Sequence, residues 1–179
     1  MKVYFDNAAT TPMRNEVIEL MTQSMSSTYG NPSSTHGFGR SAKSLIETAR
    51  KSVAKHLNCE PQEIIFTSGG TESDNMVLRS AAKKLNIRTF ISSKVEHHAV
   101  LHALDELEKE GLNICYVDLD ENGSPKLNHL ESLLMADDSI KLVSLMHINN
   151  EIGNILDIEK VGKLCKAHGA YFHTDAVQG

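Results

Sequence analysis

Short runs of β-branched and aromatic residues alternate along most of this chain with longer segments in which apolar residues recur at helical spacing. The runs that read as strands lie at residues 64–67, 88–91, 114–117, 142–146 and 170–173. Between them, segments such as residues 100–107 and 158–165 show the apolar stripe of a helix. The sequence therefore predicts an α/β fold, a three-layer, mostly parallel sheet flanked by helices.

The part of the chain before the first predicted strand reads differently. Helical spacing predicts helices over residues 16–25 and 40–57, and the turn-forming residues 29–34 between them predict a loop. Asn122-Gly123 predicts a turn, followed by a short helix at residues 127–133. With 179 residues, of which 40% are hydrophobic, the chain can bury a sizeable core.

Composition excludes several classes of function. The net charge of −5 argues against a nucleic-acid partner, which would require a basic face. The start of the chain turns polar too early for a signal peptide, and no apolar run is long enough to cross a membrane. Cys59, Cys115 and Cys165 have neither a metal-binding spacing nor an even count for disulfides, which fits a reducing compartment. We therefore expect a cytoplasmic protein.

The sharpest local motif is Thr67-Ser68-Gly69-Gly70-Thr71-Glu72-Ser73, which stands between a predicted strand and a predicted helix. Glycines let the backbone approach a ligand closely, and the free N–H groups at a helix start favour an anion such as phosphate. No Gly-Lys-Ser/Thr triplet follows, and the spacing differs from that of a dinucleotide motif, so a nucleotide is disfavoured. Taken alone, the motif fits a phosphate site and an ordinary glycine turn equally well.

Histidines cluster after the next predicted strand. His98 and His102 are four residues apart, as in a two-histidine metal site, but the pattern lacks the intervening Glu and a third ligand. Solvent-facing or capping side chains explain them better, and we predict no metal. His97 stands in the strand-to-helix loop, from which its ring could lie against a planar cofactor.

Two further motifs follow strands nearer the end of the chain. Asn149 and Asn150 are consecutive amides that could orient ligand atoms, or could form Asx turns. Asp175 follows an apolar strand, where a carboxylate requires a cationic partner unless it caps a helix.

Taken together, these candidate residues indicate one shared ligand site more strongly than any of them does alone. Ligands of open parallel sheets bind beyond the carboxyl ends of the strands, and Gly70, His97, Asn150 and Asp175 all follow predicted strands. A phosphate cradle, a flat ring, an amide and a carboxylate match the phosphate, ring, phenolic oxygen and ring nitrogen of pyridoxal 5′-phosphate.

The motifs resemble those of cysteine desulfurases of the NifS/IscS type, within the class-V aminotransferase group. The resemblance extends along the chain, through residues 6–11, 30–34, 67–73, 96–97, 149–153 and 173–178. It implies a pyridoxal-phosphate enzyme of fold type I whose large domain is incomplete here. It further implies that residues 1–15 join the small domain and that residues 16–179 form the first part of the large domain.

The resemblance also implies roles for single residues. Gly70 and Thr71 would bind the phosphate, and His97 would stack on the ring and assist proton transfer. Asn150 and Gln178 would lie near the phenolic oxygen. Asp175 would pair with the protonated ring nitrogen, because a nearby carboxylate keeps that proton in place.

The implied activity is removal of sulfur from L-cysteine, which yields L-alanine and an enzyme persulfide for iron–sulfur cluster or thio-cofactor assembly. Its implied partners are a second copy of the chain and an iron–sulfur scaffold or another sulfur-acceptor protein. The Schiff-base lysine and the sulfur-accepting cysteine of such enzymes lie beyond the resembling motifs, so we expect these 179 residues to be inactive alone. A selenocysteine lyase, another class-V enzyme, and a non-catalytic α/β dimerisation fragment stay open as alternatives.

Overall fold

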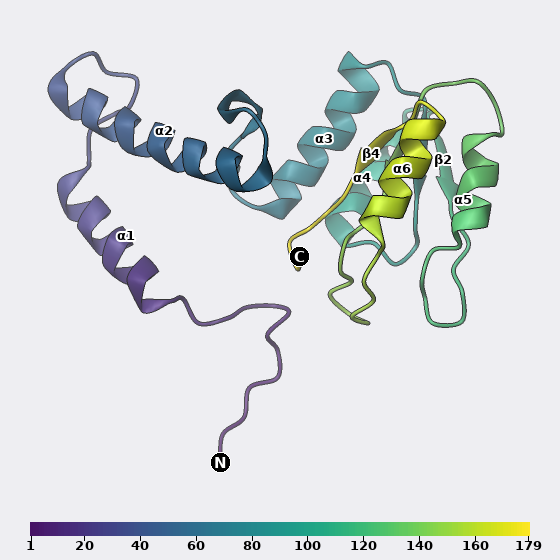
Figure 1. Cartoon of the computed structure of the whole chain (residues 1–179), viewed down its shortest axis with the longest axis horizontal. Coiled ribbons are helices and arrows are strands. Elements are labelled where there is room, and N and C mark those ends of the chain that lie inside the picture. Colours follow the sequence, from purple (N-terminus) through teal and green to yellow (C-terminus); the bar gives the residue numbers. More distant parts are fainter. The chain divides into compact units, whose positions relative to one another are not determined.

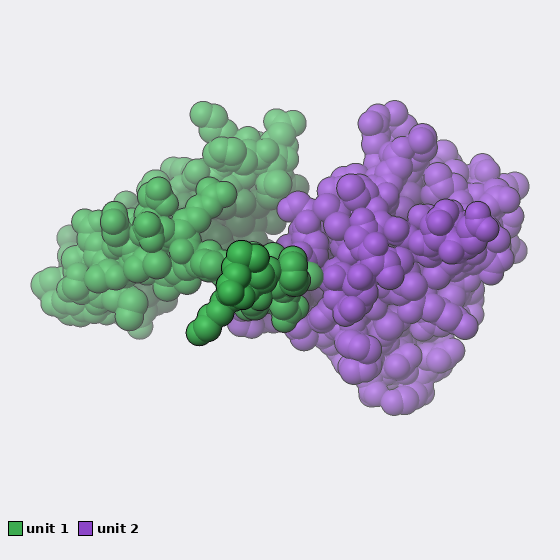
Figure 2. Space-filling model, turned by 90° about the horizontal axis from the view of Figure 1, so that it is seen from below, with its two compact units in different colours: residues 1–66 green, residues 67–179 purple.

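The computed structural model describes all residues from 1 to 179. The chain divides into two compact units, residues 1–66 and residues 67–179, which Figure 2 shows in green and purple. The predicted division into residues 1–15 and 16–179 is a different boundary and stays a prediction. No helix in the structure has both the length and the apolar character needed to span a membrane.

The first unit is helical. It contains α1 (Asn15–Ser27), α2 (Gly37–Leu57) and a 3-10 turn, η1 (Pro61–Glu63), so both predicted helices are confirmed. Residues 29–34 form the predicted loop, in which the Asn31 side chain accepts a hydrogen bond from the Ser33 N–H at 2.9 Å. Gly30 packs so closely on the Phe38 carbonyl that any Cβ there would overlap it. The tight turn therefore requires glycine.

The predicted strand at residues 64–67 is wrong, because this segment has no regular secondary structure and pairs with no strand. The Arg50 guanidinium donates a hydrogen bond to the Ile64 carbonyl, which a sheet neighbour would otherwise use. The same guanidinium lies 4.9 Å from the centre of the Phe66 ring. Ile65 and Phe66 are exposed, so the apolar run that suggested a strand covers no core here.

The second unit carries the rest of the predicted elements. Its helices are α3 (Gly70–Lys84), α4 (His98–Lys109), α5 (Leu127–Leu134) and α6 (Ile158–Ala167). Its strands are β1 (Thr89–Ser92), β2 (Asn113–Tyr116), β3 (Lys141–Ser144) and β4 (Tyr171–His173). The turn at Asn122-Gly123 is confirmed, and Gly123 adopts a φ of 80° there.

The four strands form one parallel sheet in the order β2-β1-β3-β4. Alternate strand residues face opposite sides: Phe90 and Leu142 pack with residues of α3 and α4, whereas Ile91 and Val143 pack with residues of α5 and α6. Figure 1 shows these helix pairs on the two sides of the sheet. The predicted three-layer α/β architecture is thus confirmed, and the carboxyl ends of all four strands lie at one edge.

Candidate functional site

The loops that leave β1, β3 and β4 are joined to one another by hydrogen bonds. The Met146 N–H donates to Glu96 Oε2 at 2.9 Å, and the Asn149 side chain donates to the Val95 carbonyl at 2.7 Å. The His147 N–H donates to the Asp175 carbonyl at 2.8 Å. Three of the predicted ligand-binding segments therefore meet at the carboxyl edge of the sheet.

The glycine motif forms the start of α3. Gly69 occupies the N-cap position, and no side chain caps the helix there. The Glu72 carboxylate turns back to accept hydrogen bonds from the N–H and hydroxyl of Ser68 at 2.6 and 2.7 Å, which lowers the pKa of Glu72. The first N–H groups of the helix, including those of Gly70 and Thr71, are therefore left to an outside acceptor.

Gly70 also links this helix start to the segment after β4. A Cβ atom on Gly70 would lie 2.7 Å from Cγ2 of Val177, a distance that would require Val177 to move. Because Val177 stands two residues beyond Asp175, the predicted phosphate loop and the predicted ring-nitrogen partner are neighbours in space.

His97 is the N-cap residue of α4 and is exposed. Its Nδ1 accepts a hydrogen bond from the Ala99 N–H at 3.1 Å. A ring nitrogen that accepts from an amide carries no hydrogen, so the neutral ring holds its hydrogen on Nε2. In this arrangement His97 presents a donor, and it must release Ala99 before Nε2 can take up a proton.

The two consecutive amides have different surroundings. Asn149 is buried, and its Oδ1 accepts hydrogen bonds from the N–H groups of Glu151 and Ile152 at 2.8 and 3.0 Å. It therefore shapes the loop after β3, as the Asx-turn alternative anticipated. Asn150 is half-buried, and its side chain donates to Glu151 at 3.2 Å, so it lies nearer the surface of the same loop.

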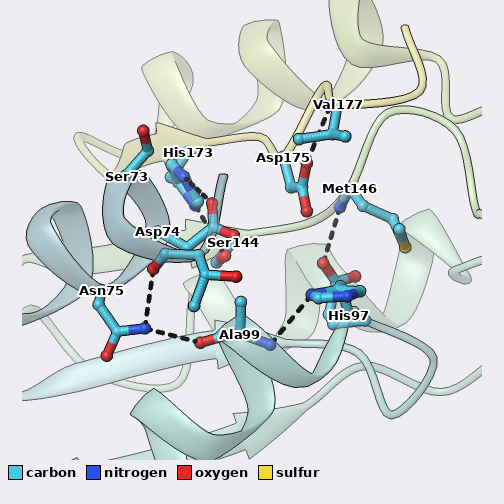
Figure 3. Close-up of polar contacts among 12 residues, drawn as sticks. Ser73, Asp74, Asn75, His97, Ala99, Ser144, Met146, His173, Asp175 and Val177 are labelled. Atoms are coloured by element: carbon cyan, nitrogen blue, oxygen red, sulfur yellow. Dashed lines mark hydrogen bonds and ion pairs between the residues drawn. The ribbon is translucent and has the colours of Figure 1, made fainter. Parts of the chain in front are cut away.

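Asp175 lies just beyond β4 and is 8% exposed. Its Oδ1 accepts a hydrogen bond from the Val177 N–H at 2.9 Å (Figure 3), which leaves acceptor capacity on the carboxylate for a cation. Gln178, three residues later, is half-buried in the same terminal turn.

The sequence analysis gave no separate role to Glu96, whose carboxylate joins the loop after β1 to the loop after β3. Glu96 is 6% exposed, and Ser93 donates to its second oxygen at 2.7 Å. The pKa of Glu96 is raised to about 7; burial is the main cause, its two hydrogen bonds oppose the rise, and the nearby carboxylates of Asp175 and Asp74 add to it. The available signal in the sequence was a carboxyl residue in the short loop between an apolar strand and the next helix.

Asp74 and His173 form a second group without a predicted role. His173 Nε2 lies 3.4 Å from Asp74 Oδ1, and His173 Nδ1 lies 2.9 Å from the hydroxyl of Ser144. Figure 3 shows this contact between α3, β3 and β4. Asp74 follows the glycine motif by one residue, but sequence spacing alone does not indicate a partner a hundred residues away.

A cavity of about 160 Å³ lies next to Glu96, which is one of its lining residues. The rest of its wall is mostly apolar and includes Leu127, Met146, Ile155 and Leu156. None of the six predicted site residues lines it.

His98 and His102 have ring centres 5.3 Å apart, and no group of three or more potential ligands could hold a metal.

The chemistry of these residues fits pyridoxal phosphate. The uncapped start of α3 suits a phosphate, the exposed imidazole of His97 suits a planar ring, and the buried carboxylate of Asp175 suits a protonated ring nitrogen. The carboxylates of Asp175 and Asp74 also raise the pKa of Glu96, as acidic groups close to one another do.

Comparison with known proteins places these observations in a family. The family described as aminotransferase class-V matches residues 3–179. A cysteine desulfurase IscS from Dictyoglomus turgidum is 48% identical over 179 residues, which are 99% of this chain and 45% of that protein. The IscS cysteine desulfurase of Methanosarcina thermophila is 45% identical over 178 residues, 98% of this chain and 44% of the relative.

Solved structures of related proteins have the same fold as this chain. A NifS-like protein superposes with a TM-score of 0.94 and 42% identity, covering 100% of this chain and 50% of that one. A structure described as SspA in complex with cysteine gives a TM-score of 0.92 and 34% identity, covering 98% of this chain and 51% of the other. The chain thus spans about half the length of the relatives it matches.

Proposed function

Because the chain belongs to the class-V aminotransferase family, we propose that the whole protein is a pyridoxal-phosphate-dependent cysteine desulfurase. It removes sulfur from L-cysteine and leaves L-alanine and a persulfide on the enzyme. The names of its relatives support this activity. The observation that carries the proposal is the buried Asp175 carboxylate beside the uncapped start of α3.

The N–H groups of Gly70 and Thr71 and the Thr71 hydroxyl bind the phosphate in this proposal. The positive end of the α3 dipole adds to those hydrogen bonds. The Glu72 carboxylate, although it is in the first turn, is held by Ser68, so its charge is partly neutralised by donors of the loop itself.

The remaining residues orient the ring. Asp175 accepts a hydrogen bond from the protonated ring nitrogen, and Asn150 and Gln178 donate to the phenolic oxygen. His97 lies against one face of the ring. Its exposed position at the start of α4 supports that role, and its Nε2–H can donate toward a reacting atom.

When bound, pyridoxal phosphate supplies an electron sink for the electrons released at the α carbon of the amino acid. Asp175 keeps the ring nitrogen protonated, and a proton on that nitrogen is what makes the ring an effective acceptor of electrons. His97 moves a proton at the substrate through Nε2, and Nε2 can accept a proton only after Nδ1 has released the Ala99 N–H.

We propose that residues 1–179 alone turn over little cysteine. None of their three cysteines matches the motif of the sulfur-accepting residue. Cys165 is buried, and burial raises the pKa of its thiol to about 11, so the nucleophilic thiolate is scarce at neutral pH. The proposal also includes a homodimer and a sulfur-acceptor protein as partners of the whole protein.

The test is a titration of this chain with pyridoxal phosphate, followed by absorbance and by the melting temperature. We expect saturable binding and a rise in melting temperature, because a ligand that binds only the folded state stabilises it. Asp175→Asn should weaken binding by roughly ten- to a hundredfold, since it removes the partner of the ring cation.

The matched control is Asp118→Asn, an exposed carboxylate outside the site, which should bind like the unmodified chain. Absence of saturable binding would exclude the cofactor site and favour a non-catalytic α/β fragment. Sulfide or alanine formed by this chain in excess of its own concentration would contradict the proposed inactivity.

A further inference from the structure

The Asp74–His173 pair is a buried polar contact of the second unit that the proposed chemistry leaves without a role. Asp74 is 3% exposed, and its Oδ2 is buried without a hydrogen-bond partner. The two side chains of the pair have exposed fractions of 5% and 12%. A buried carboxylate that is only half satisfied destabilises a fold unless its one partner is well placed.

The hydrogen positions in this pair follow from its partners. A carboxylate can only accept, so a hydrogen on His173 Nε2 is what makes the 3.4 Å contact with Asp74 Oδ1 favourable. The Ser144 hydroxyl can donate to His173 Nδ1 or accept from it. Either way, both ring nitrogens are engaged and the ring cannot rotate without breaking two contacts.

The contact between His173 and Ser144 continues across the sheet to β1. The Ser144 carbonyl accepts a hydrogen bond from the Ser92 hydroxyl at 2.9 Å. Side chains of β1, β3 and β4 are thereby connected to α3 at the level of the strands' carboxyl ends. Asp74 stands three residues after Thr71, and His173 stands two residues before Asp175, so the pair joins the two segments that carry the proposed phosphate and ring-nitrogen ligands.

We propose that Asp74 and His173 are positioning residues that hold the start of α3 at a set distance from Asp175, so that one cofactor can contact both at once. The inference rests on the proposed function and deepens it. The pair touches neither the phosphate nor the ring, and it acts through the backbone segments that do. Its effect should therefore appear only for a ligand that possesses both groups.

The experiment compares dissociation constants of pyridoxal phosphate and pyridoxal, which lacks the phosphate, for the chain and for Asp74→Ala and Asp74→Asn. The dissociation constant of pyridoxal divided by that of pyridoxal phosphate measures how much affinity the phosphate adds. This quotient is the ratio used below. Asp74→Ala should lower this ratio about tenfold, because the helix start is no longer held in register with Asp175. Asp74→Asn should lower it less than about threefold, since its amide oxygen still accepts from His173.

Ser144→Ala is a milder second variant for the case in which Asp74→Ala does not fold. It removes only the contact to His173 Nδ1, and it should lower the ratio about twofold to threefold. The control is Asp137→Asn, which removes the negative charge that faces the buried Lys141 at the opposite end of β3. It should lower the melting temperature and leave the ratio unchanged.

Hydrogen exchange of the ligand-free chain separates this inference from the proposed function. Asp74→Ala should speed exchange of the amides of residues 70–74 and 174–176 more than Asp137→Asn does. An unchanged ratio, or exchange that rises equally everywhere, overturns the positioning role. If the unmodified chain binds no pyridoxal phosphate, the proposed function fails, and a local rise in exchange still shows that the pair fixes α3 against β4.

Discussion

Glu96 shows how burial and hydrogen bonding oppose each other at a single residue. Both carboxyl oxygens accept hydrogen bonds, from Ser93 and from the Met146 N–H, and these lower the pKa. Desolvation outweighs them, and the pKa rises from 4.5 to about 7. Near neutral pH, Glu96 is therefore only partly ionised, and it lies between two loops that carry proposed cofactor ligands.

Glu96→Gln should make the free energy of unfolding less dependent on pH. A carboxyl whose pKa is higher in the folded state stabilises fully below its unfolded value of 4.5, and the contribution is lost as the pH rises through about 7. That loss amounts to about 3 kcal/mol, and the glutamine variant avoids it. Its amide can accept from Met146 and donate to Ser93, so both contacts survive.

Urea unfolding at pH 5 and pH 8 measures this difference. Stability of the variant relative to the unmodified chain should increase from the lower pH to the higher. The exposed Glu106→Gln provides the control and should change little. If the Glu96 variant and the unmodified chain lose stability in parallel between the two pH values, the raised pKa is not present in the folded protein.

Among the elements, β3 is anchored at its amino end by a buried ammonium group. The Lys141 side chain is 3% exposed, and its Nζ donates to Asp137 Oδ1 at 2.8 Å, to the Asp137 carbonyl at 2.7 Å and to the Ser139 carbonyl at 3.2 Å. The lysine thus closes the α5–β3 loop onto the central part of the sheet. The same contact lowers the pKa of Asp137 below its usual range.

Asp137→Asn should lower the melting temperature at pH 7 by roughly 5 °C, because the buried ammonium keeps only neutral acceptors. The difference from the unmodified chain should shrink as the pH falls below 3.8, the unfolded value. A carboxylate with a lowered pKa stabilises fully above its unfolded value and loses this effect progressively as the pH falls from there through its lowered folded value. Calorimetry at pH 7 and pH 3 tests this, and a constant difference would contradict it.

At the scale of the whole molecule, apolar surface is left uncovered. No residue of α1 is buried, and the exposed hydrophobic side chains of that helix are Val17, Ile18, Leu20, Met21 and Met25. At the edge of the sheet, β4 also exposes Tyr171. Surface of this kind is typical of sites that another chain or another part of a protein covers.

We therefore expect these 179 residues to self-associate at micromolar concentration, as light scattering would show. Leu20→Lys combined with Met21→Glu should reduce the association, because both positions are exposed and apolar. Thr22→Lys, on the same helix but at a polar exposed position, is the control. A monodisperse monomer of the unmodified chain would refute the expectation.

Local patterns were enough to predict most elements. The strands β1 to β4, the helices and the turn at Gly123 follow from short-range periodicity and turn chemistry, which depend on neighbouring residues only. The wrong strand prediction at residues 64–67 has the same cause, because it too was based on neighbouring residues only. An apolar run of that length indicates a strand only if a partner edge is available, and here the Ile64 carbonyl binds Arg50 instead.

The motif order alone was sufficient to suggest the family and to nominate Gly70, Thr71, His97, Asn150, Asp175 and Gln178, whose roles stay proposals. Tertiary structure alone decided which polar side chains are buried and what they contact. Glu96 meets Met146 across 50 positions of sequence, and Asp74 meets His173 across 99. Burial and charge coupling are properties of the packed chain, because desolvation depends on residues that are distant in sequence and adjacent only after folding.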